Sequence, residues 1–378
     1  MDHEIAISGT GIAGLAAATA VLRANRNCVL LGPPAQIVTG GVQLAPNGWA
    51  ALTALGLAQD VMAQATRLHE ITVRSLTNNA TLARLPLRDV YASVARSNLA
   101  AIFEQKVAKS NCVSRRATCV KATTQTDTSV NIIDKDSGLH HVAGLIAADG
   151  VAGFGRSFIS GQSETTIKAA LQTEKVALRS VISLSDLQRF FSQPASNLWL
   201  GNGVHIVHYP IGNNANIVAT MSKTLANTDW QDRLFAHNEP MRILADKTIE
   251  WTSTPLPRSS TTICWRRGNV VLAGDAAHIM PPHLAQGAGQ SLQDAACLMQ
   301  SLVQNANVGN AFAAYARHRS GAVAKIARKA EVSGKIMAFS GVAGKLRNAL
   351  IDLGGSHLMQ SWLKEVWAAD PGLGSQRV

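Results

Sequence analysis

A glycine-rich turn near the start of the chain restricts the fold more than any other feature. An apolar run at residues 4–8 is followed by an Ala-rich helical stretch, and a second apolar run occupies residues 28–31. Between the first run and the helix, Gly9, Gly11 and Gly14 fit the pattern G-x-G-x-x-G. In a β-α-β unit these glycines make the turn, admit a pyrophosphate to the helix N-terminus and pack helix on strand. We therefore predict a dinucleotide-binding β-α-β domain, with a ligand-free glycine turn as the alternative.

The end of the second predicted strand departs from this pattern. An acidic residue usually stands there and binds the adenosine ribose. Here the CVLL run ends in Gly32-Pro33-Pro34. We expect the loss of one charge-assisted hydrogen-bond pair to weaken dinucleotide binding by about 1–2 kcal/mol. Gly32→Glu is accordingly expected to tighten binding.

Two later stretches indicate a flavin dinucleotide. In residues 145–156 an apolar strand ends in Asp149-Gly150, and Arg156 follows. From Val270 another apolar strand runs into Gly274-Asp275. A lone β-α-β unit needs neither stretch. A flavin whose sugar chain and ring extend beyond the first glycine loop needs both.

The second of these stretches offers specific flavin contacts. Asp275 ends a strand at the edge of the sheet where doubly wound folds bind ligands, so its carboxylate can accept two sugar hydroxyls. The alternative is a helix N-cap. Pro281 and Pro282 fix an extended corner whose free carbonyls could face the flavin ring. The helix expected from about Ala288 points its N-terminal amides at the flavin, where negative charge develops on reduction.

From Ile5 to about Arg319 the sequence resembles the flavoprotein aromatic hydroxylases of the para-hydroxybenzoate hydroxylase fold, and among them the salicylate hydroxylase-like enzymes. The three motifs above match that family's ADP-binding loop, D-G motif and G-D motif, and Arg96 with Leu99 is similar to its R-x-x-L helix. Gly153 departs from the family by replacing a serine. The resemblance implies flavin or NAD(P)H contacts at Gly9, Gly11, Ala13, Gly14, Arg96, Asp149, Gly150, Arg156, Gly274, Asp275, Pro282, Gly287, Ala288 and Gly289.

The resemblance also implies the fold class, α/β with a Rossmann-like FAD-binding domain, a second β-sheet substrate domain and C-terminal helices. Short alternating runs between Cys112 and Ile146 indicate an antiparallel meander. The chain beyond Asn310 has a helical pattern. We predict an FAD-binding domain at 1–70, 95–165 and 265–320, a substrate domain at 71–94 and 166–264, and a helical region at 321–378.

The activity implied by the resemblance is that of an FAD-dependent monooxygenase. Such an enzyme uses NAD(P)H and O2 to hydroxylate a phenol or aromatic hydroxy acid through a flavin hydroperoxide. Two alternatives stay open. One is a quinone-precursor hydroxylase at a membrane surface, and the other is a flavin-binding protein without turnover.

The candidate catalytic residues are His208, His283 and Pro281. In a strand, His205 and His208 point to opposite faces, so one of the two can line a substrate pocket. The similarity of HIVHYPI to a substrate-domain strand of the family favours His208. His283 lies on the flavin-side loop and is a comparable candidate base. His278 is expected to be structural.

Charge and cysteine content exclude some classes of protein. The net charge of +11 comes from scattered Lys and Arg, and no block of five like charges is present, so we do not expect nucleic-acid binding. The five cysteines contain no C-x-x-C pair, which favours reduced thiols in the cytoplasm. The start lacks the order of a signal peptide, and no clustered metal-ligand pattern occurs.

The sequence of the C-terminal region is compatible with two binding partners, a membrane surface or the FAD-binding domain of the same chain. Residues 322–354 alternate basic and apolar side chains at helical spacing. They could lie on an anionic membrane, or they could cover the FAD-binding domain with solvated lysines. The protein is expected to be a monomer or a homodimer that acts on a small aromatic substrate.

Overall fold

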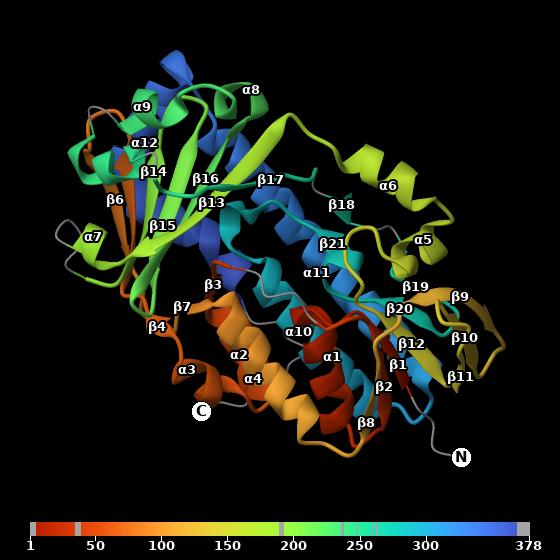
Figure 1. Cartoon of the computed structure of the whole chain (residues 1–378). Coiled ribbons are helices and arrows are strands. Elements are labelled where there is room, and N and C mark those ends of the chain that lie inside the picture. Colours follow the sequence, from red (N-terminus) through yellow and green to blue (C-terminus); the bar gives the residue numbers. More distant parts are fainter. Residues whose placement is uncertain are drawn as a thin grey trace.

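The computed structural model describes residues 5–34, 39–188, 193–235, 238–246, 248–258, 260–261 and 264–368. In these residues the chain forms a mainly parallel sheet, a larger mixed sheet and a set of long helices that lie along both (Figure 1). None of the helices in the described residues combines the length and the hydropathy of a membrane-spanning segment.

The first sheet carries the predicted β-α-β unit. Its strands, in spatial order, are β19 (Arg266–Arg267), β20 (Val270–Leu272), β12 (Gly144–Ala147), β1 (Ile5–Ser8), β2 (Cys28–Leu31) and β8 (Val113–Arg116). All neighbours are parallel except β19 and β20. Every residue of β1, β2, β12 and β20 is buried, as expected for a parallel sheet that is covered on both faces.

Helices cover one face of this sheet and a small antiparallel sheet covers the other. On the helical face, Ile7 and Leu30 pack with α1 (Ile12–Arg23), α4 (Arg96–Ala108), α10 (Gly287–Gln304) and the start of α11 (Val308–Met337). On the other face, Val29 and Leu31 pack against β9 (Val120–Gln125), β10 (Val130–Asp134), β11 (Leu139–Val142) and α5 (Phe154–Ser160).

The meander predicted between Cys112 and Ile146 is correct for β9, β10 and β11, which pair antiparallel. It is wrong for the two ends of that segment, because β8 and β12 join the parallel sheet. A short apolar run does not reveal its partner strand, and both ends lie beside β1 or β2 only after the chain has folded.

The second sheet is a mixed sheet that contains the predicted strand HIVHYPI. Its strands, in spatial order, are β17 (Thr252–Pro255), β13 (Lys175–Ser183), β16 (Asn214–Ser222), β15 (His205–Ile211), β14 (Ala195–Leu200), β5 (Glu70–Ser75) and β6 (Thr81–Pro86). Only β14 and β5 pair parallel among these described strands. One face buries Trp199, Ile206 and Ile217 together with α9 (Trp230–Phe235) and the 3-10 helix η1 (Glu239–Ala245).

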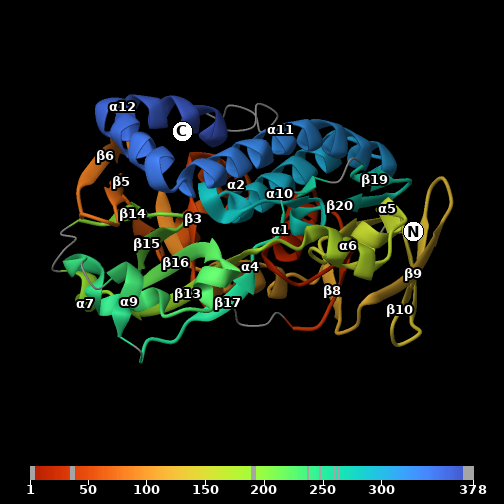
Figure 2. The ribbon, with the colours of Figure 1, turned by 90° about the horizontal axis from the view of Figure 1, so that it is seen from above.

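The C-terminal helices connect the two sheets. Figure 2 shows α10, α11 and α12 (Gly341–Trp367) as a layer on one side of the molecule, with the mixed sheet beneath α11 and α12. The helical pattern predicted beyond Asn310 agrees with α11 and α12. The other described elements are β3 (Gly41–Leu44), α2 (Pro46–Ala54), α3 (Ala58–Met62), β4 (Thr66–Arg67), β7 (Ala92–Ala95), α6 (Glu164–Leu171), α7 (Ser185–Gln188), α8 (Lys223–Ala226), β18 (Ser260–Thr261), η2 (Gly274–Ala276), β21 (His278–Ile279) and η3 (Pro282–Leu284).

The division into two domains stays a proposal. The strands of the parallel sheet come from segments assigned to the FAD-binding domain. The small sheet β3-β7-β4 joins segments from both sides of the proposed division, because β7 pairs with β3 and β4.

Candidate functional site

A cavity of about 790 Å³ lies along the carboxyl edge of the parallel sheet, and we call it the dinucleotide cavity. The turn after β1, the end of β2, the helix α4 and the start of α10 form its walls. Its lining includes Thr10, Gly11, Ile12, Ala13, Gly32, Arg96, Glu104, Arg115, Gly150, Asp275, Gly287, Ala288 and Ser291.

The three glycines of the first turn have different surroundings. Gly9 has a φ of +106°, and a Cβ there would lie 2.3 Å from the carbonyl oxygen of Ala148. A Cβ on Gly14 would lie 1.9 Å from the carbonyl oxygen of Gly9. A Cβ on Gly11 would have no atom within 4 Å. Gly9 and Gly14 thus permit close backbone packing, whereas Gly11 leaves space in the cavity for a ligand.

The D-G motif divides between the cavity and the helix behind it. Gly150, with a φ of +82°, lines the cavity. The Asp149 carboxylate instead accepts hydrogen bonds from Ser8 Oγ at 3.2 Å and the Gly155 amide at 3.1 Å, at the start of α5. Burial raises the pKa of Asp149, and these hydrogen bonds oppose that shift. A Cβ on Gly153 would lie 2.2 Å from Asp149 Cγ, so glycine in place of serine suits this carboxylate position.

Arg156 does not line the dinucleotide cavity. It is buried, and its guanidinium donates to the carbonyl oxygens of Ser260 at 3.2 Å and Ala277 at 3.5 Å. Burial lowers the pKa of Arg156, and the charge of Asp275 opposes this. Arg156 therefore ties α5 to the loop that follows Asp275.

The G-D motif forms the turn after β20. Gly274 has a φ of +60°, and a Cβ there would lie 2.5 Å from the Ala13 Cβ, so glycine lets this turn approach α1. Asp275 is exposed to the dinucleotide cavity and to a second cavity, which lies on the mixed sheet. Its carboxylate is therefore available to a bound ligand.

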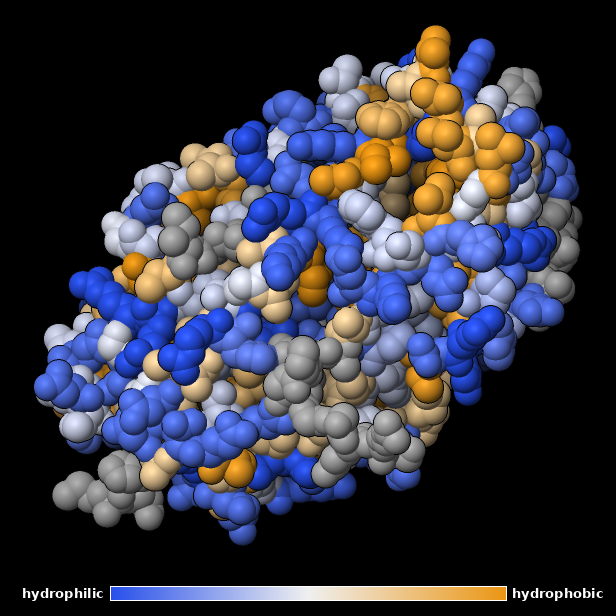
Figure 3. Space-filling model, turned by 180° about the vertical axis from the view of Figure 1, so that it is seen from behind, coloured by the Kyte–Doolittle hydropathy of each residue, from blue (hydrophilic) through white to orange (hydrophobic). Residues whose placement is uncertain are grey.

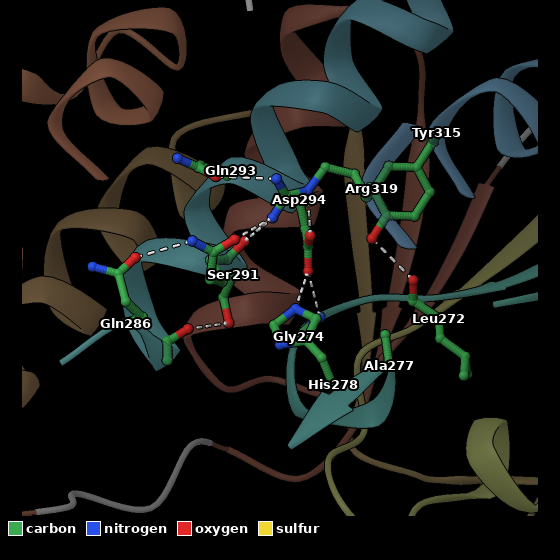
Figure 4. Close-up of polar contacts among 12 residues, drawn as sticks. Leu272, Gly274, Ala277, His278, Gln286, Ser291, Gln293, Asp294, Tyr315 and Arg319 are labelled. Carbon is green, nitrogen blue, oxygen red and sulfur yellow. Dashed lines mark hydrogen bonds and ion pairs between the residues drawn. The ribbon is translucent and has the colours of Figure 1, made fainter. Parts of the chain in front are cut away.

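A buried carboxylate that the sequence did not single out, Asp294 of α10, holds this turn (Figure 4). Asp294 Oδ2 accepts from the Gly274 amide at 2.9 Å and lies 2.7 Å from His278 Nε2. Asp294 Oδ1 accepts from Arg319 Nε at 2.9 Å. Burial alone would raise the pKa of Asp294, but His278 and Arg319 hold it below its ordinary value. His278 is itself buried, and its contact with Asp294 is consistent with the structural role expected of it.

The same network fixes α11 against α10. Arg319, which is 1% exposed, also donates to Gln293 Oε1 at 3.0 Å and Gln290 Oε1 at 2.7 Å. The Tyr315 hydroxyl donates to the carbonyl oxygen of Leu272 at 3.0 Å (Figure 4). The end of β20 is therefore held from two helices.

The proline corner and the start of α10 have separate roles. Pro282 lines the second cavity, whereas Pro281 is buried and does not line it. Gly287 and Ala288 line both cavities. Gly289 packs against α2, where a Cβ on Gly48 would lie 3.4 Å from the Gly289 Cα.

The second cavity, of about 650 Å³, lies between the mixed sheet and the helices α11 and α12. Val42, Arg96, Asp275, Gly287 and Ala288 line both cavities, so the two meet at the start of α10. We call the second one the sheet cavity. Its sheet face is formed by alternate residues of five strands: Ile71, Val73, Arg179, Ser196, Leu198, Leu200, His205, Val207, Tyr209, Val218 and Thr220.

The prediction that His208, rather than His205, lines the pocket is wrong. They do point to opposite faces, but His205 lines the sheet cavity with Val207 and Tyr209, and His208 does not. His208 is 3% exposed and stacks on Trp199, with ring centroids 6.3 Å apart, on the other face of the sheet. The registers in which β15 pairs with β14 and β16 decide which histidine faces the cavity. These registers cannot be inferred from the sequence of one strand.

His205 and His283 form a contact inside the sheet cavity. His205 Nε2 lies 3.2 Å from His283 Nδ1, and the ring centroids are 5.0 Å apart. Burial lowers the pKa of His205 well below 6.5, and the charges of His283, Lys175 and Arg347 lower it further. Burial, with Lys175, lowers the pKa of His283 to about 4. Both rings are therefore neutral at neutral pH.

Arg179 brings a positive charge to the same cavity and was missed in the sequence. Its guanidinium donates to the hydroxyl of Thr254. Burial lowers the pKa of Arg179, Arg96 lowers it further, and Tyr209 opposes them. Two guanidinium groups thus act on each other in a cavity whose lining is mainly apolar. An anionic ligand would relieve this repulsion.

The end of the dinucleotide cavity at Gly32 differs further from the expected dinucleotide-binding pattern. Gly32 has a φ of +156°, and a Cβ there would lie 2.9 Å from Thr10 Cγ2. Glu104 of α4 lines this cavity and pairs with Arg115 of β8 at 2.6 Å. An acidic side chain thus lines this cavity from α4, although the residue that follows β2 is a glycine.

We predict that Asp294→Asn destabilises the fold by about 3–5 kcal/mol, because Arg319 would stay buried without its carboxylate. Unfolding in urea measures the change. The folded pKa of Asp294 is depressed, so this stabilisation is present above the unfolded pKa, about 3.9, and is lost as pH falls through the folded pKa. Asp136→Asn, in an exposed turn, is the control and should change stability by less than about 0.5 kcal/mol. Equal losses in both variants would contradict the assigned role.

The backbone at Gly32 reverses the expectation that Gly32→Glu tightens dinucleotide binding. A side chain at this φ is strained, so Gly32→Ala and Gly32→Glu should each lower stability by about 1–2 kcal/mol. Glu104→Gln, which leaves the backbone unstrained, should weaken FAD binding about tenfold. FAD titration and thermal melts of the three variants measure both effects. Tighter FAD binding by Gly32→Glu without loss of stability would show that the strain argument fails.

Comparison with known proteins agrees with this geometry. The family described as FAD binding domain matches residues 2–330. The chain is 28% identical over 375 residues to 3-hydroxybenzoate 6-hydroxylase of Polaromonas naphthalenivorans strain CJ2, covering 92% of each protein. It is 26% identical over 356 residues to 3-amino-4-hydroxybenzoate 2-monooxygenase PtnB3 of Streptomyces platensis, covering 88% of this chain and 87% of that protein.

Solved structures show the same fold. HpxO of Klebsiella pneumoniae, complexed with FAD and uric acid, has a TM-score of 0.81 at 18% identity and covers 97% of each chain. A salicylate hydroxylase substrate complex has a TM-score of 0.79 at 21% identity and covers 98% of this chain and 96% of that one. The predicted fold class and the resemblance to flavoprotein aromatic hydroxylases are confirmed. The chain belongs to the FAD binding domain family.

Proposed function

We propose that the protein is an FAD-dependent monooxygenase that uses NAD(P)H and O2 to hydroxylate the ring of a phenolic acid. The observation that carries this proposal is the meeting of two cavities at Arg96, Asp275 and the start of α10. One cavity belongs to the dinucleotide fold, and the other presents a neutral histidine pair and Arg179. The names of the relatives, which describe hydroxylation of hydroxybenzoates, support the same reaction class.

The residues of the dinucleotide cavity fit FAD. Gly11 leaves open space beside the helix N-terminus, and the exposed Asp275 carboxylate can accept hydroxyls of the sugar chain. Glu104 offers acidic oxygens at the ribose end, where Gly32 offers none. When bound, FAD supplies the electron transfer and the oxygen chemistry. The start of α10 would present its positive dipole end to the ring.

The histidine pair is proposed to accept the phenolic proton. Phenols ionise near pH ~10 in water, whereas an aromatic ring is attacked faster as the phenolate. A neutral imidazole can accept that proton, and the phenolate it leaves behind raises the pKa of the adjacent imidazolium. His205 and His283 replace His208 in this role because they line the sheet cavity.

Arg179 is proposed to bind the carboxylate of the substrate. It lies on the sheet face of the cavity with His205, two strands away. A planar guanidinium and a carboxylate form paired hydrogen bonds, and a ligand carboxylate would offset the repulsion between Arg179 and Arg96. The substrate would then be oriented by its acid group and deprotonated at its hydroxyl group.

We predict that His205→Asn lowers single-turnover hydroxylation by about 10²–10⁴-fold while FAD stays bound, because the pair would lose its proton acceptor. The folded pKa of His283 is about 4. The wild-type rate should therefore have no histidine step between about pH 6 and 9. Product formation, rather than NAD(P)H consumption, measures the rate.

The matched control is His208→Asn, which changes an equally buried histidine on the other face of the sheet. Its hydroxylation rate should stay near wild type. A wild-type rate in His205→Asn together with a slow His208→Asn would return the role to His208. NAD(P)H oxidation that ignores every aromatic acid in both forms would favour a flavin-binding protein without hydroxylase turnover.

We predict that Arg179→Met raises the KM for a hydroxybenzoate about 10–100-fold, the loss expected for one charged hydrogen-bond pair. Arg179→Lys should recover part of this loss. The carboxamide analogue of the same substrate should bind the wild type and Arg179→Met equally, since it has no charge to lose. A carboxamide that is weakened as much as the acid by Arg179→Met would contradict a carboxylate contact.

A further inference from the structure

The first half of α12 exposes an apolar stripe. Val342, Leu346, Leu350 and Leu353 are 83%, 60%, 54% and 85% exposed. Their spacing of four, four and three residues places them on one face of the helix. Scattered exposed apolar residues are ordinary on soluble proteins, but a continuous stripe marks a surface that binds something. We call these four residues the α12 stripe.

The stripe adjoins the mouth of the sheet cavity. Ile336, Leu358 and Trp362 are 38%, 62% and 36% exposed, and each also lines that cavity. Figure 3 shows apolar residues gathered around a hollow at the end of the molecule where α12 lies. An apolar surface thus continues from the outside of α12 into the cavity.

The helices that carry this surface are basic. Residues 321–368 contain seven Lys or Arg and three Asp or Glu, a net charge of +4. Next to the stripe, Lys345 and Asp352 are both exposed. The exposed positive charge therefore comes mainly from residues elsewhere on α11 and α12: Lys325, Arg328 and Lys364. Exposed basic side chains on the helices that carry an apolar stripe complement anionic lipid headgroups. Two copies of this chain joined through the stripe would oppose their positive charges and would cover the cavity mouth.

We propose that the α12 stripe docks on the surface of an anionic bilayer, and that the sheet cavity receives aromatic substrates with an apolar substituent from the lipid. Docking alone is independent of catalysis, whereas the statement about substrates rests on the proposed function. A cavity of about 650 Å³ with apolar residues at its mouth has room for a ring at Arg179 and His205 and for a substituent that extends toward α12.

Flotation with vesicles tests the docking. The full chain with FAD is mixed with vesicles of phosphatidylcholine alone or with about one-third phosphatidylglycerol. The wild type should float with the anionic vesicles, less so at high salt. A triple variant, Leu346→Gln with Leu350→Gln and Leu353→Gln, should bind them at least about tenfold more weakly. Leu139→Gln, which changes a residue 71% exposed on β11, is the matched control and should float like the wild type.

Three results would overturn the docking. One is a wild type that does not float with anionic vesicles. Another is a triple variant that floats as well as the wild type. The third is a dimer, detected by sedimentation, that the triple variant loses while neither protein floats, since the stripe would then join two copies of this chain.

Turnover assays with two kinds of substrate distinguish a failure of membrane docking from a failure of the proposed function. Turnover of a water-soluble hydroxybenzoate should be equal in the wild type and the triple variant, because the stripe does not line the cavity. Turnover of an alkyl-substituted phenolic acid presented in anionic vesicles should fall about tenfold in the triple variant. Equal turnover of the vesicle-borne substrate would overturn delivery from lipid. Flotation without turnover of any phenolic acid would reject the proposed function and leave docking intact.

Discussion

The buried carboxylate of Asp294 holds together the part of the fold on which both cavities depend. A carboxylate that is 1% exposed is costly unless it is fully paired, and Asp294 contacts a backbone amide, a histidine and an arginine. These partners come from the turn after β20, from β21 and from α11. One residue of α10 therefore sets the position of Asp275 and of the helix start that borders both cavities.

Strand alternation imposes a second constraint, which decides the chemistry of the sheet cavity. Neighbouring strands of the mixed sheet align Leu200 with His205 and His205 with Thr220, and these residues share one face. The other face packs on Trp199 and α9, and His208 lies there. A shift of register by one residue would exchange the two histidines, so the site depends on the pairing of the whole sheet.

The sequence was sufficient to predict those structural features that are determined by one continuous segment of the chain. The turn at Gly9, the strand into Asp275 and the helical pattern after Asn310 each lie within one continuous segment. Features that need a partner from elsewhere in the chain were not predictable. Asp294 resembles any polar residue of a helix until His278 and Arg319 are placed beside it. The side of the sheet on which His205 lies, its contact with His283 and the placement of Arg179 in the same cavity as Arg96 likewise depend on parts of the chain that are distant in sequence.

Uncompensated positive charge links ligand binding to the stability of the protein. Arg179 is partly desolvated, and Arg96 and Tyr209 are the titratable groups that act on its pKa, so burial and like charge both oppose its ionised form. An anion bound at Arg179, as proposed above, would remove part of this unfavourable energy and would bind only the folded chain. The ligand therefore stabilises the protein by an amount that grows with its concentration relative to Kd. In the proposed route, the apolar entrance would admit molecules that leave lipid, and Arg179 inside the cavity would retain those that carry an acid group.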